Sequence, residues 1–249
     1  MRVVCERSLE HGNDVFICFV DFEKAFDRID WVKMVKILKK IGVDWRDRRL
    51  IMNLYMNQKA VIKIQQEVSD ECEIGRGVRQ GCCMSPLLFN IYAEAMMMEA
   101  MEGIEEGIKI GGKLLNDVRF ADDQGMIAGS QNGLQTIMDR LNDTALTYCM
   151  RINIKKTKVM RVSRQGGDVK ITINGILVEQ VKSFKYLGHT MTEDGRCETE
   201  IRCRITQAKR DLWQHEAAIN KKFAEIHKDK DSKNSSVDHA TIRIGNLDT

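Results

Sequence analysis

The chain has 249 residues, of which 43% are hydrophobic and 30% charged, and its formal net charge is +3. This length suits one large domain with a packed core, and the small net charge excludes a histone-like basic protein. The eight cysteines lack the CxxC spacing of a zinc site, and no apolar run is long enough to span a bilayer. Because the first residues are too charged for a signal peptide, we expect an intracellular protein, nuclear or cytoplasmic, that is not secreted and has no membrane contact.

The first elements predict a buried strand followed by two helices. The apolar run 15–20 ends at Asp21 and is typical of a strand that is buried on both faces. Asp30 is a candidate N-cap for a helix with apolar residues at helical spacing as far as Gly42. A second helix is expected over residues 45–57.

The next segment predicts a strand pair, a glycine-rich loop and a helix. Residues 60–66 alternate as in a strand, and residues 71–75 could pair with them. The apolar stretch 86–101 indicates a buried helix, with Ser85 as its expected N-cap and Pro86 in its first turn.

Residues 113–120 and 124–128 predict two strands that place Ala121-Asp122-Asp123 at the tip of a hairpin. An amphipathic helix over residues 134–148 should follow. Strands are then expected around residues 158–162 and 169–173, and Asn174-Gly175 is a strong hairpin turn. This order of elements favours an α+β architecture.

The C-terminal part predicts one more helix and a tail. The helix should begin at Thr192 or Asp194, with arginines and lysines on one face that could contact phosphates or simply face solvent. Beyond Lys228 the sequence is polar, and we expect a disordered tail.

Two acidic sites, Asp21 and Asp122-Asp123, each adjoin apolar strands. Carboxylates brought together in a fold raise one another's pKa unless cations compensate, so such a cluster favours divalent metals and phosphoryl or nucleotidyl transfer. An Asp-Asp pair alone is more often an exposed turn, and it is the repetition of the pattern at two strand ends that indicates a site.

Three motifs follow one another along the chain: Phe19-Val20-Asp21-Phe22-Glu23-Lys24-Ala25-Phe26-Asp27, the run from Gly77 to Tyr92, and Phe120-Ala121-Asp122-Asp123. They resemble, in the same order, the catalytic motifs of reverse transcriptases from non-LTR, LINE-like retrotransposons. Residues 150–158 resemble the fourth motif, and residues 184–188 resemble the segment that leads toward the thumb. The resemblance spans about residues 15–213, and together these motifs are highly specific.

The resemblance implies a right-hand polymerase palm, an antiparallel sheet packed on helices, that carries out RNA-directed DNA synthesis. Asp21, Asp122 and Asp123 would bind two Mg²⁺ ions, with Mn²⁺ as an alternative, and so act in catalysis. Lys156 would supply a proton to the leaving pyrophosphate, although Lys155 or Lys158 could equally be the lysine meant. The implied partners are an RNA template, a DNA primer and dNTPs.

Four further residues are implied in dNTP binding. Phe26 matches the steric gate that would exclude a ribose 2′-hydroxyl, although without the motif it could equally be a core aromatic. Gln80 and Gly81 match the loop that packs against the incoming nucleotide and the template base, where glycine permits close approach. Phe22, next to Asp21, is assigned to the same substrate site.

The resemblance also predicts the organisation of the chain. Residues 1–14 would be a remnant of the connection between fingers and palm, 15–192 the palm, 193–228 a partial thumb-like helix and 229–249 the disordered tail. With most of the fingers missing, we expect exposed apolar surface and self-association, and an activity that truncation could abolish. The alternatives are a catalytically dead nucleic-acid-binding remnant and a palm-like nucleotidyl transferase or cyclase.

Overall fold

The computed structural model describes residues 1–121, 123–195 and 200–214, and Asp122, residues 196–199 and residues 215–249 lie outside the described part. The chain divides into two compact units, Met1–Arg196 and Cys197–Thr249, which are considered separately. In the second unit, residues 200–214 form a helix.

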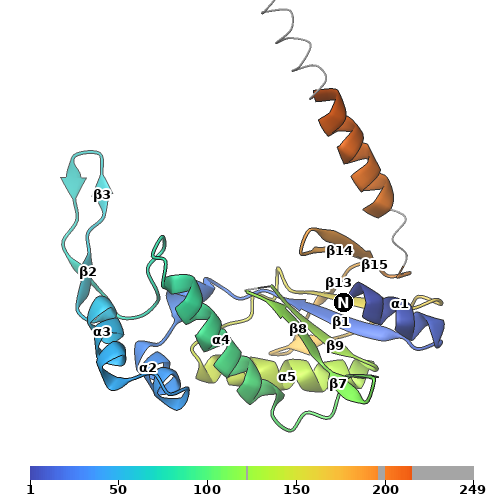
Figure 1. Cartoon of the computed structure of the whole chain (residues 1–249), viewed down its shortest axis with the longest axis horizontal. Coiled ribbons are helices and arrows are strands. Elements are labelled where there is room, and N and C mark those ends of the chain that lie inside the picture. Colours follow the sequence, from blue (N-terminus) through green and yellow to red (C-terminus); the bar gives the residue numbers. More distant parts are fainter. Residues whose placement is uncertain (122, 196–199, 215–249) are drawn as a thin grey trace, which may run out of the picture. The chain divides into compact units, whose positions relative to one another are not determined.

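The first unit mixes helices with short strands (Figure 1). Its elements are, in chain order, α1 (Arg2–Glu10), β1 (Val15–Val20), the 3₁₀ helix η1 (Ala25–Arg28), α2 (Trp31–Lys40), α3 (Trp45–Tyr55), β2 (Gln58–Ala60), β3 (Lys63–Ile64), β4 (Glu67–Val68), β5 (Cys72–Ile74), α4 (Ser85–Met101), β6 (Ile108–Ile110), β7 (Lys113–Leu115), β8 (Asp117–Phe120), β9 (Asp123–Ala128), α5 (Gln131–Thr147), β10 (Lys158–Val162), β11 (Thr172–Ile173), β12 (Ile176–Leu177), β13 (Glu179–Gln180), β14 (Ser183–Tyr186) and β15 (His189–Thr192). The predicted α+β class is confirmed.

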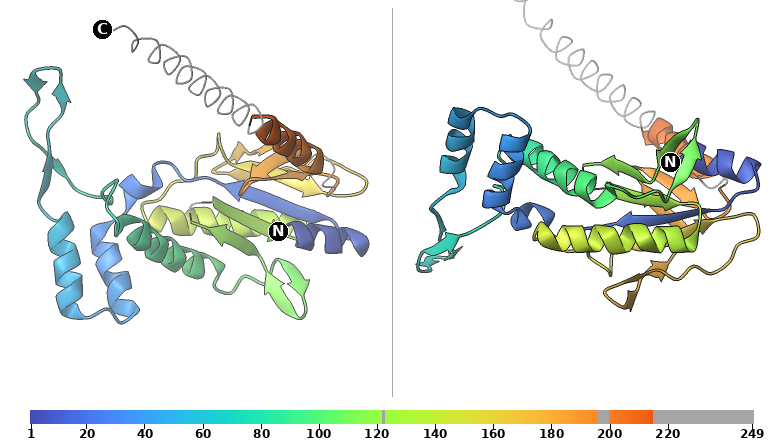
Figure 2. Two further views of the ribbon diagram at one scale, coloured as in Figure 1. Left: turned by 45° about the horizontal axis from the view of Figure 1, so that its top comes forward. Right: turned by 90° about the horizontal axis from the view of Figure 1, so that it is seen from below.

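Among the described residues, five strands form the central sheet in the order β13-β10-β1-β9-β8. The β1, β8, β9 and β10 pairings are antiparallel, and β13 adds to β10 in parallel. β1 is therefore an interior strand with paired neighbours on both sides. Helices α4 and α5 lie side by side under this sheet (Figure 2).

The continuous apolar sequence of β1 follows from burial on both faces, as predicted. Phe16, Cys18 and Val20 face the core formed with α2, α4 and α5. Val15, Ile17 and Phe19 alternate with them and pack with Cys5 and Leu9 of α1 and Tyr186 of β14. Helix α1, which the sequence did not predict, covers the second face of the strand.

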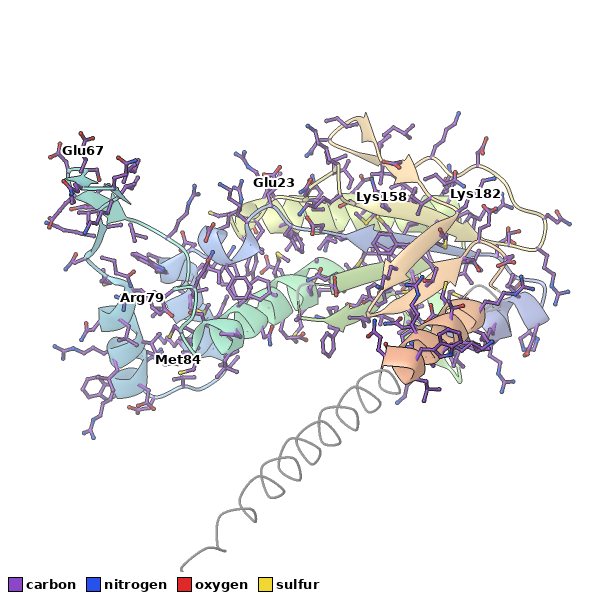
Figure 3. The ribbon with its side chains drawn as sticks, turned by 90° about the horizontal axis from the view of Figure 1, so that it is seen from above. Glu23, Glu67, Arg79, Met84, Lys158 and Lys182 are labelled. Atoms are coloured by element: carbon purple, nitrogen blue, oxygen red, sulfur yellow. The ribbon has the colours of Figure 1, made fainter. Side chains whose placement is uncertain are left out.

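A long hairpin follows α3 where a strand pair was predicted, but the strand at residues 72–74 pairs with residues 58–60 and not along 60–66. β2 pairs with β5 and β3 with β4, and the ribbon projects from the end of α3, with Glu67 at its far end (Figure 3). The turn at Asn174 and Gly175 joins β11 to β12, as predicted, with φ values of 52° and 75°.

Two predicted helix starts are wrong. Met84 is the N-cap of α4 and Ser85 is its first residue, because the Ser85 hydroxyl donates to the carbonyl of Arg79 at 2.6 Å instead of capping the helix. Neither Thr192 nor Asp194 begins a helix, because Thr192 ends β15 and Asp194 lies in a turn. The helix predicted to follow runs over residues 200–214 where it is described, and the expected tail lies outside the described residues.

Candidate active site

Asp21 follows the last residue of β1, and its backbone is fixed by the segment that precedes β10. The Asp21 N–H donates to the hydroxyl of Thr157 at 3.3 Å, and its carbonyl accepts from the N–H of Asn153 at 2.7 Å. Phe22 forms a β-bridge with Ile152. Thr157 is fully buried, so this segment forms a rigid support under Asp21. Sequence reasoning missed Thr157, although it lies in the fourth motif.

Asp123 begins β9 and pairs with Phe120 across the hairpin. In the β1–β9 pairing Val20 lies opposite Gln124, so one further step of the same antiparallel register brings Asp21 beside Asp123. Ala121, in the turn between the strands, has a positive φ of 54°. Asp122 lies outside the described residues, and the described His, Cys, Asp and Glu side chains alone form no group of three that could hold a metal ion.

One oxygen of Asp21 is suited to a cation. The Asp21 side chain is 42% exposed, but its Oδ2 is buried and accepts no hydrogen bond within the described part of the chain. A buried carboxylate oxygen without a donor is costly, and a cation would offset that cost. Since Mg²⁺ prefers oxygen ligands, the donor set of Asp21 and Asp123 fits a magnesium ion.

Of the three lysines that the fourth motif offers, Lys156 lies nearest to this oxygen. Its Nζ is 3.9 Å from Asp21 Oδ2, and the lysine side chain is 71% exposed. Lys158 is engaged elsewhere, because its Nζ donates to Glu179 at 2.6 Å and to the carbonyl of Lys155 at 2.7 Å. Figure 3 shows Lys158 on its strand. A proton-donating role of Lys156 stays a prediction.

The two phenylalanines assigned to the substrate site lie in different surroundings. Phe26, in η1, is half-buried and stacks on Phe89 of α4, with ring centroids 4.5 Å apart and an interplanar angle of 15°. Phe22 is buried in the main core, so its ring packs among apolar side chains. Any contact of Phe22 with a nucleotide would therefore involve its backbone.

The loop that leads into α4 is fixed against η1 and the residues after it. The N–H groups of Gly77 and Val78 donate to the carbonyls of Ile29 at 2.8 Å and Phe26 at 2.9 Å. Gly77 has φ +90°, and a Cβ there would lie 2.9 Å from the Cα of Asp27. The backbone approach therefore requires glycine.

The exposed part of this loop carries the residues predicted to contact a nucleotide. Gln80 and Gly81 are both exposed, and Gly81 has φ +79° with open space around it. Arg79 and Met84 flank this part of the loop at the start of α4 (Figure 3). The structure thus places Gln80 and Gly81 in the loop anchored at Phe26.

Cys82, next in this loop, has a lowered pKa. A hydrogen bond from the backbone N–H of Met84 is the main cause, and it outweighs desolvation, which raises the pKa. Cys82 therefore loses its proton at a lower pH than an ordinary thiol does.

Tyr186, in the β14–β15 hairpin, contacts the β8–β9 hairpin that carries Asp123. Its hydroxyl donates to the carbonyls of Val118 at 3.0 Å and Asp123 at 3.2 Å, one on each strand of the hairpin. Burial, with the nearby charge of Asp123, raises the pKa of Tyr186 to about 12, so the hydroxyl keeps its proton. In the sequence, Tyr186 was noted only as part of residues 184–188, which resemble the segment that leads toward the thumb, and its contact with Asp123 was not predicted.

Known reverse transcriptases resemble this chain in sequence. Residues 2–191 match the family model described as reverse transcriptase (RNA-dependent DNA polymerase). A retrovirus-related Pol polyprotein from the retrotransposable element R2 of Nasonia vitripennis is 26% identical over 74% of this chain and 17% of its own length. The RNA-directed DNA polymerase from the mobile element jockey of Drosophila funebris is 26% identical over 69% of this chain and 19% of its own length.

The fold resembles solved structures of telomerase. Apo telomerase from Candida tropicalis aligns with a TM-score of 0.55 and 12% identity, over 77% of this chain and 33% of the telomerase chain. This similarity concerns the fold alone, and it agrees with the predicted palm. The chain spans less than a fifth of the length of the R2 and jockey relatives. None of the helices in the described part has the length and hydropathy needed to cross a bilayer.

Proposed function

The chain belongs to the reverse transcriptase (RNA-dependent DNA polymerase) family, and we propose on that basis that it is the catalytic palm of a non-LTR retrotransposon polymerase, which adds dNTPs to a DNA primer on an RNA template. The observation that carries the proposal is the register of β1 and β9, which brings Asp21 beside Asp123. The Oδ2 of Asp21, which accepts no hydrogen bond from any described residue, supports a cation at this point.

In this proposal Asp21, Asp122 and Asp123 hold the Mg²⁺ ions. When bound, these ions would activate the primer 3′-hydroxyl and stabilise the charge on the triphosphate and departing pyrophosphate. The protein's own contribution is to hold the carboxylates in place. Thr157 and Asn153 hold the backbone of Asp21, and Tyr186 holds the carbonyl of Asp123.

In this proposal Lys156 acts on the leaving group. Its ammonium lies 3.9 Å from Oδ2 of Asp21, and the lysine side chain is mostly exposed to solvent, where a bound triphosphate could reach it. A lysine there can stabilise phosphate charge and donate a proton to the pyrophosphate oxygen.

Phe26 and the loop at Gln80 and Gly81 would select and orient the nucleotide. The stacking of Phe26 on Phe89 holds its ring in one orientation, as a steric gate against a 2′-hydroxyl requires. The N–H of Val78 donates to the carbonyl of Phe26, which links the gate to the loop that carries Gln80 and Gly81.

Template dependence tests this function directly. The purified chain would be given a DNA primer, dNTPs and Mg²⁺, with an annealed RNA template, with a DNA template or with none. The proposal predicts dNTP addition that follows the sequence of the RNA template. Addition without a template, or cyclisation of a single nucleotide, would support the nucleotidyl transferase or cyclase alternative. Binding of primer-template without any addition would support the inactive remnant.

A further inference from the structure

Helices α2 and α3 form a strongly basic surface that the proposed catalytic site does not use. Residues 31–57 contain seven lysines and arginines and two aspartates, an excess of five positive charges, whereas the whole chain has a net charge of +3. The remainder of the chain is therefore slightly negative. This helical hairpin is one of the strongly basic segments of the chain, together with residues 150–164, which contain six lysines and arginines and no acid.

Five side chains at the connected ends of these helices define the basic tip: Lys39, Lys40, Trp45, Arg46 and Arg49. The loop 41–44 joins the helices, which lie side by side (Figures 1 and 2), so the end of α2 and the start of α3 are neighbours. All five residues are exposed. The opposite side of the hairpin is anchored in the core through residues such as Leu38 and Tyr55.

The cations of the basic tip outnumber the acids beside them. These four cations form no ion pair with any described residue. Asp44 uses a carboxylate oxygen to cap α3, accepting from the N–H of Arg46 at 2.8 Å. Asp47, which is also exposed, lies between Arg46 and Arg49, so four cations stand against two aspartates and the basic tip keeps an excess of positive charge.

An exposed tryptophan lies among these cations. Trp45 is 56% exposed, and the guanidinium of Arg46 lies 5.5 Å from the centre of its ring. Arg49 follows Trp45 by one helical turn, so the two share a face of α3. Cations that follow a phosphate backbone, together with an aromatic ring on which a base can stack, are the combination that binds single-stranded nucleic acid.

We propose that the basic tip binds a single nucleic-acid strand, with Trp45 stacking on a base and the four cations contacting phosphates. The inference deepens the proposed function, on which it rests for the identity of the strand: a polymerase that copies RNA needs to hold the unpaired template outside its active site. Double-stranded nucleic acid would lack an accessible base for Trp45.

The test is a binding measurement that needs no catalysis. Fluorescence anisotropy would follow short labelled single strands of RNA and DNA of the same sequence, and an RNA duplex, over a series of salt concentrations. The test variant carries Lys39→Gln, Lys40→Gln, Arg46→Gln and Arg49→Gln. The matched control carries Lys109→Gln, Lys113→Gln, Arg164→Gln and Lys170→Gln, which removes the same charge from exposed cations elsewhere.

The test variant should reduce the salt dependence of single-strand binding by about three in the slope of log K against log salt, and the control by much less. Trp45→Ala should weaken binding by about five-fold or more, and Trp45→Phe should restore most of it. Equal behaviour of the test variant and the control would overturn the proposal. So would a Trp45→Ala variant that binds RNA normally and changes only the oligomeric state, since the surface would then contact protein.

Asp21→Asn separates this inference from the proposed function. This variant should bind single strands as tightly as the wild type while losing primer extension. If the wild type extends no primer but its binding depends on the basic tip, the polymerase proposal fails and the inference stands. If primer extension is normal and the substitutions in the basic tip leave single-strand binding unchanged, the inference fails and the polymerase proposal stands.

Discussion

The hydroxyl of Tyr186 donates to the carbonyl of Asp123 at 3.2 Å, and so fixes one side of the acidic turn from a strand that is distant in sequence. The same hydroxyl also donates to Val118 at 3.0 Å, which ties both strands of the hairpin together. β8 is an edge strand of the central sheet, and this contact limits how far the backbone at Asp123 can move.

Tyr186→Phe should therefore lower catalysis more than stability. Loss of this donor costs about 1 kcal/mol of unfolding free energy, whereas a displaced carboxylate should slow dNTP addition about ten-fold. Tyr148→Phe is the matched control, since its hydroxyl donates to Glu99 at 2.8 Å, on α4. Denaturant unfolding and single-turnover extension would be measured for both. Equal rates for the two variants would show that the Tyr186 contact does not position Asp123.

Phe26→Val should relax sugar selection. Removing the ring opens the space where a 2′-hydroxyl would lie, so we expect the preference for dNTP over NTP to fall by about ten-fold or more. Phe89→Leu removes the stacking partner 4.5 Å away and should give a smaller loss of selectivity. Competition between a dNTP and the matching NTP in primer extension measures both. Unchanged selectivity in Phe26→Val would mean that Phe26 is a core aromatic only.

Gly77→Ala and Gly81→Ala should differ in stability although both have positive φ. At Gly77 a Cβ would lie 2.9 Å from the Cα of Asp27, and at Gly81 it meets nothing within 4 Å. We expect a loss of about 1 kcal/mol at Gly81, from φ alone, and about 3 kcal/mol at Gly77. Thermal unfolding of the two variants would show the difference. Similar losses would contradict the close packing of the loop on Asp27.

Cys82 should be the thiol that reacts first near neutral pH. Its pKa is lowered chiefly by the N–H of Met84, so its thiolate fraction at a given pH is larger than that of an ordinary thiol. Limited iodoacetamide labelling followed by peptide mass spectrometry should find Cys82 modified ahead of the exposed Cys72. Bound primer-template and dNTP should protect Cys82 if the adjacent Gly81 contacts the nucleotide. Equal labelling of the two thiols would argue against the lowered pKa.

Sequence patterns correctly predicted the elements whose structure depends on residues close together in the chain. The apolar run 15–20 predicted a strand buried on both faces, and Asp30 caps α2 by accepting from the N–H of Lys33 at 2.7 Å. The hairpin around Ala121 also formed where alternation and the acidic turn predicted it. In these cases the signal lies within a few residues of the element.

The N-terminus of α4 and the supports of Asp21 and Asp123 depend on tertiary contacts, which no local sequence pattern predicts. The Ser85 hydroxyl bonds to Arg79 because the preceding loop folds back, so an expected cap became the first helical residue. The support of Asp21 by Thr157 spans 136 residues, and the Tyr186 contact with Asp123 spans 63. Motif resemblance placed these residues in order along the chain without stating which atoms meet.

The most direct test of the central claim is primer extension on an RNA template by Asp21→Asn and Asp123→Asn proteins, compared with Asp168→Asn, an exposed aspartate outside the site. Circular dichroism would first establish that all three are folded. We predict that Asp21→Asn and Asp123→Asn each reduce dNTP addition by about a thousand-fold or more, while Asp168→Asn retains the wild-type rate. Wild-type extension by either site variant would contradict the assignment of this acidic cluster as the catalytic centre.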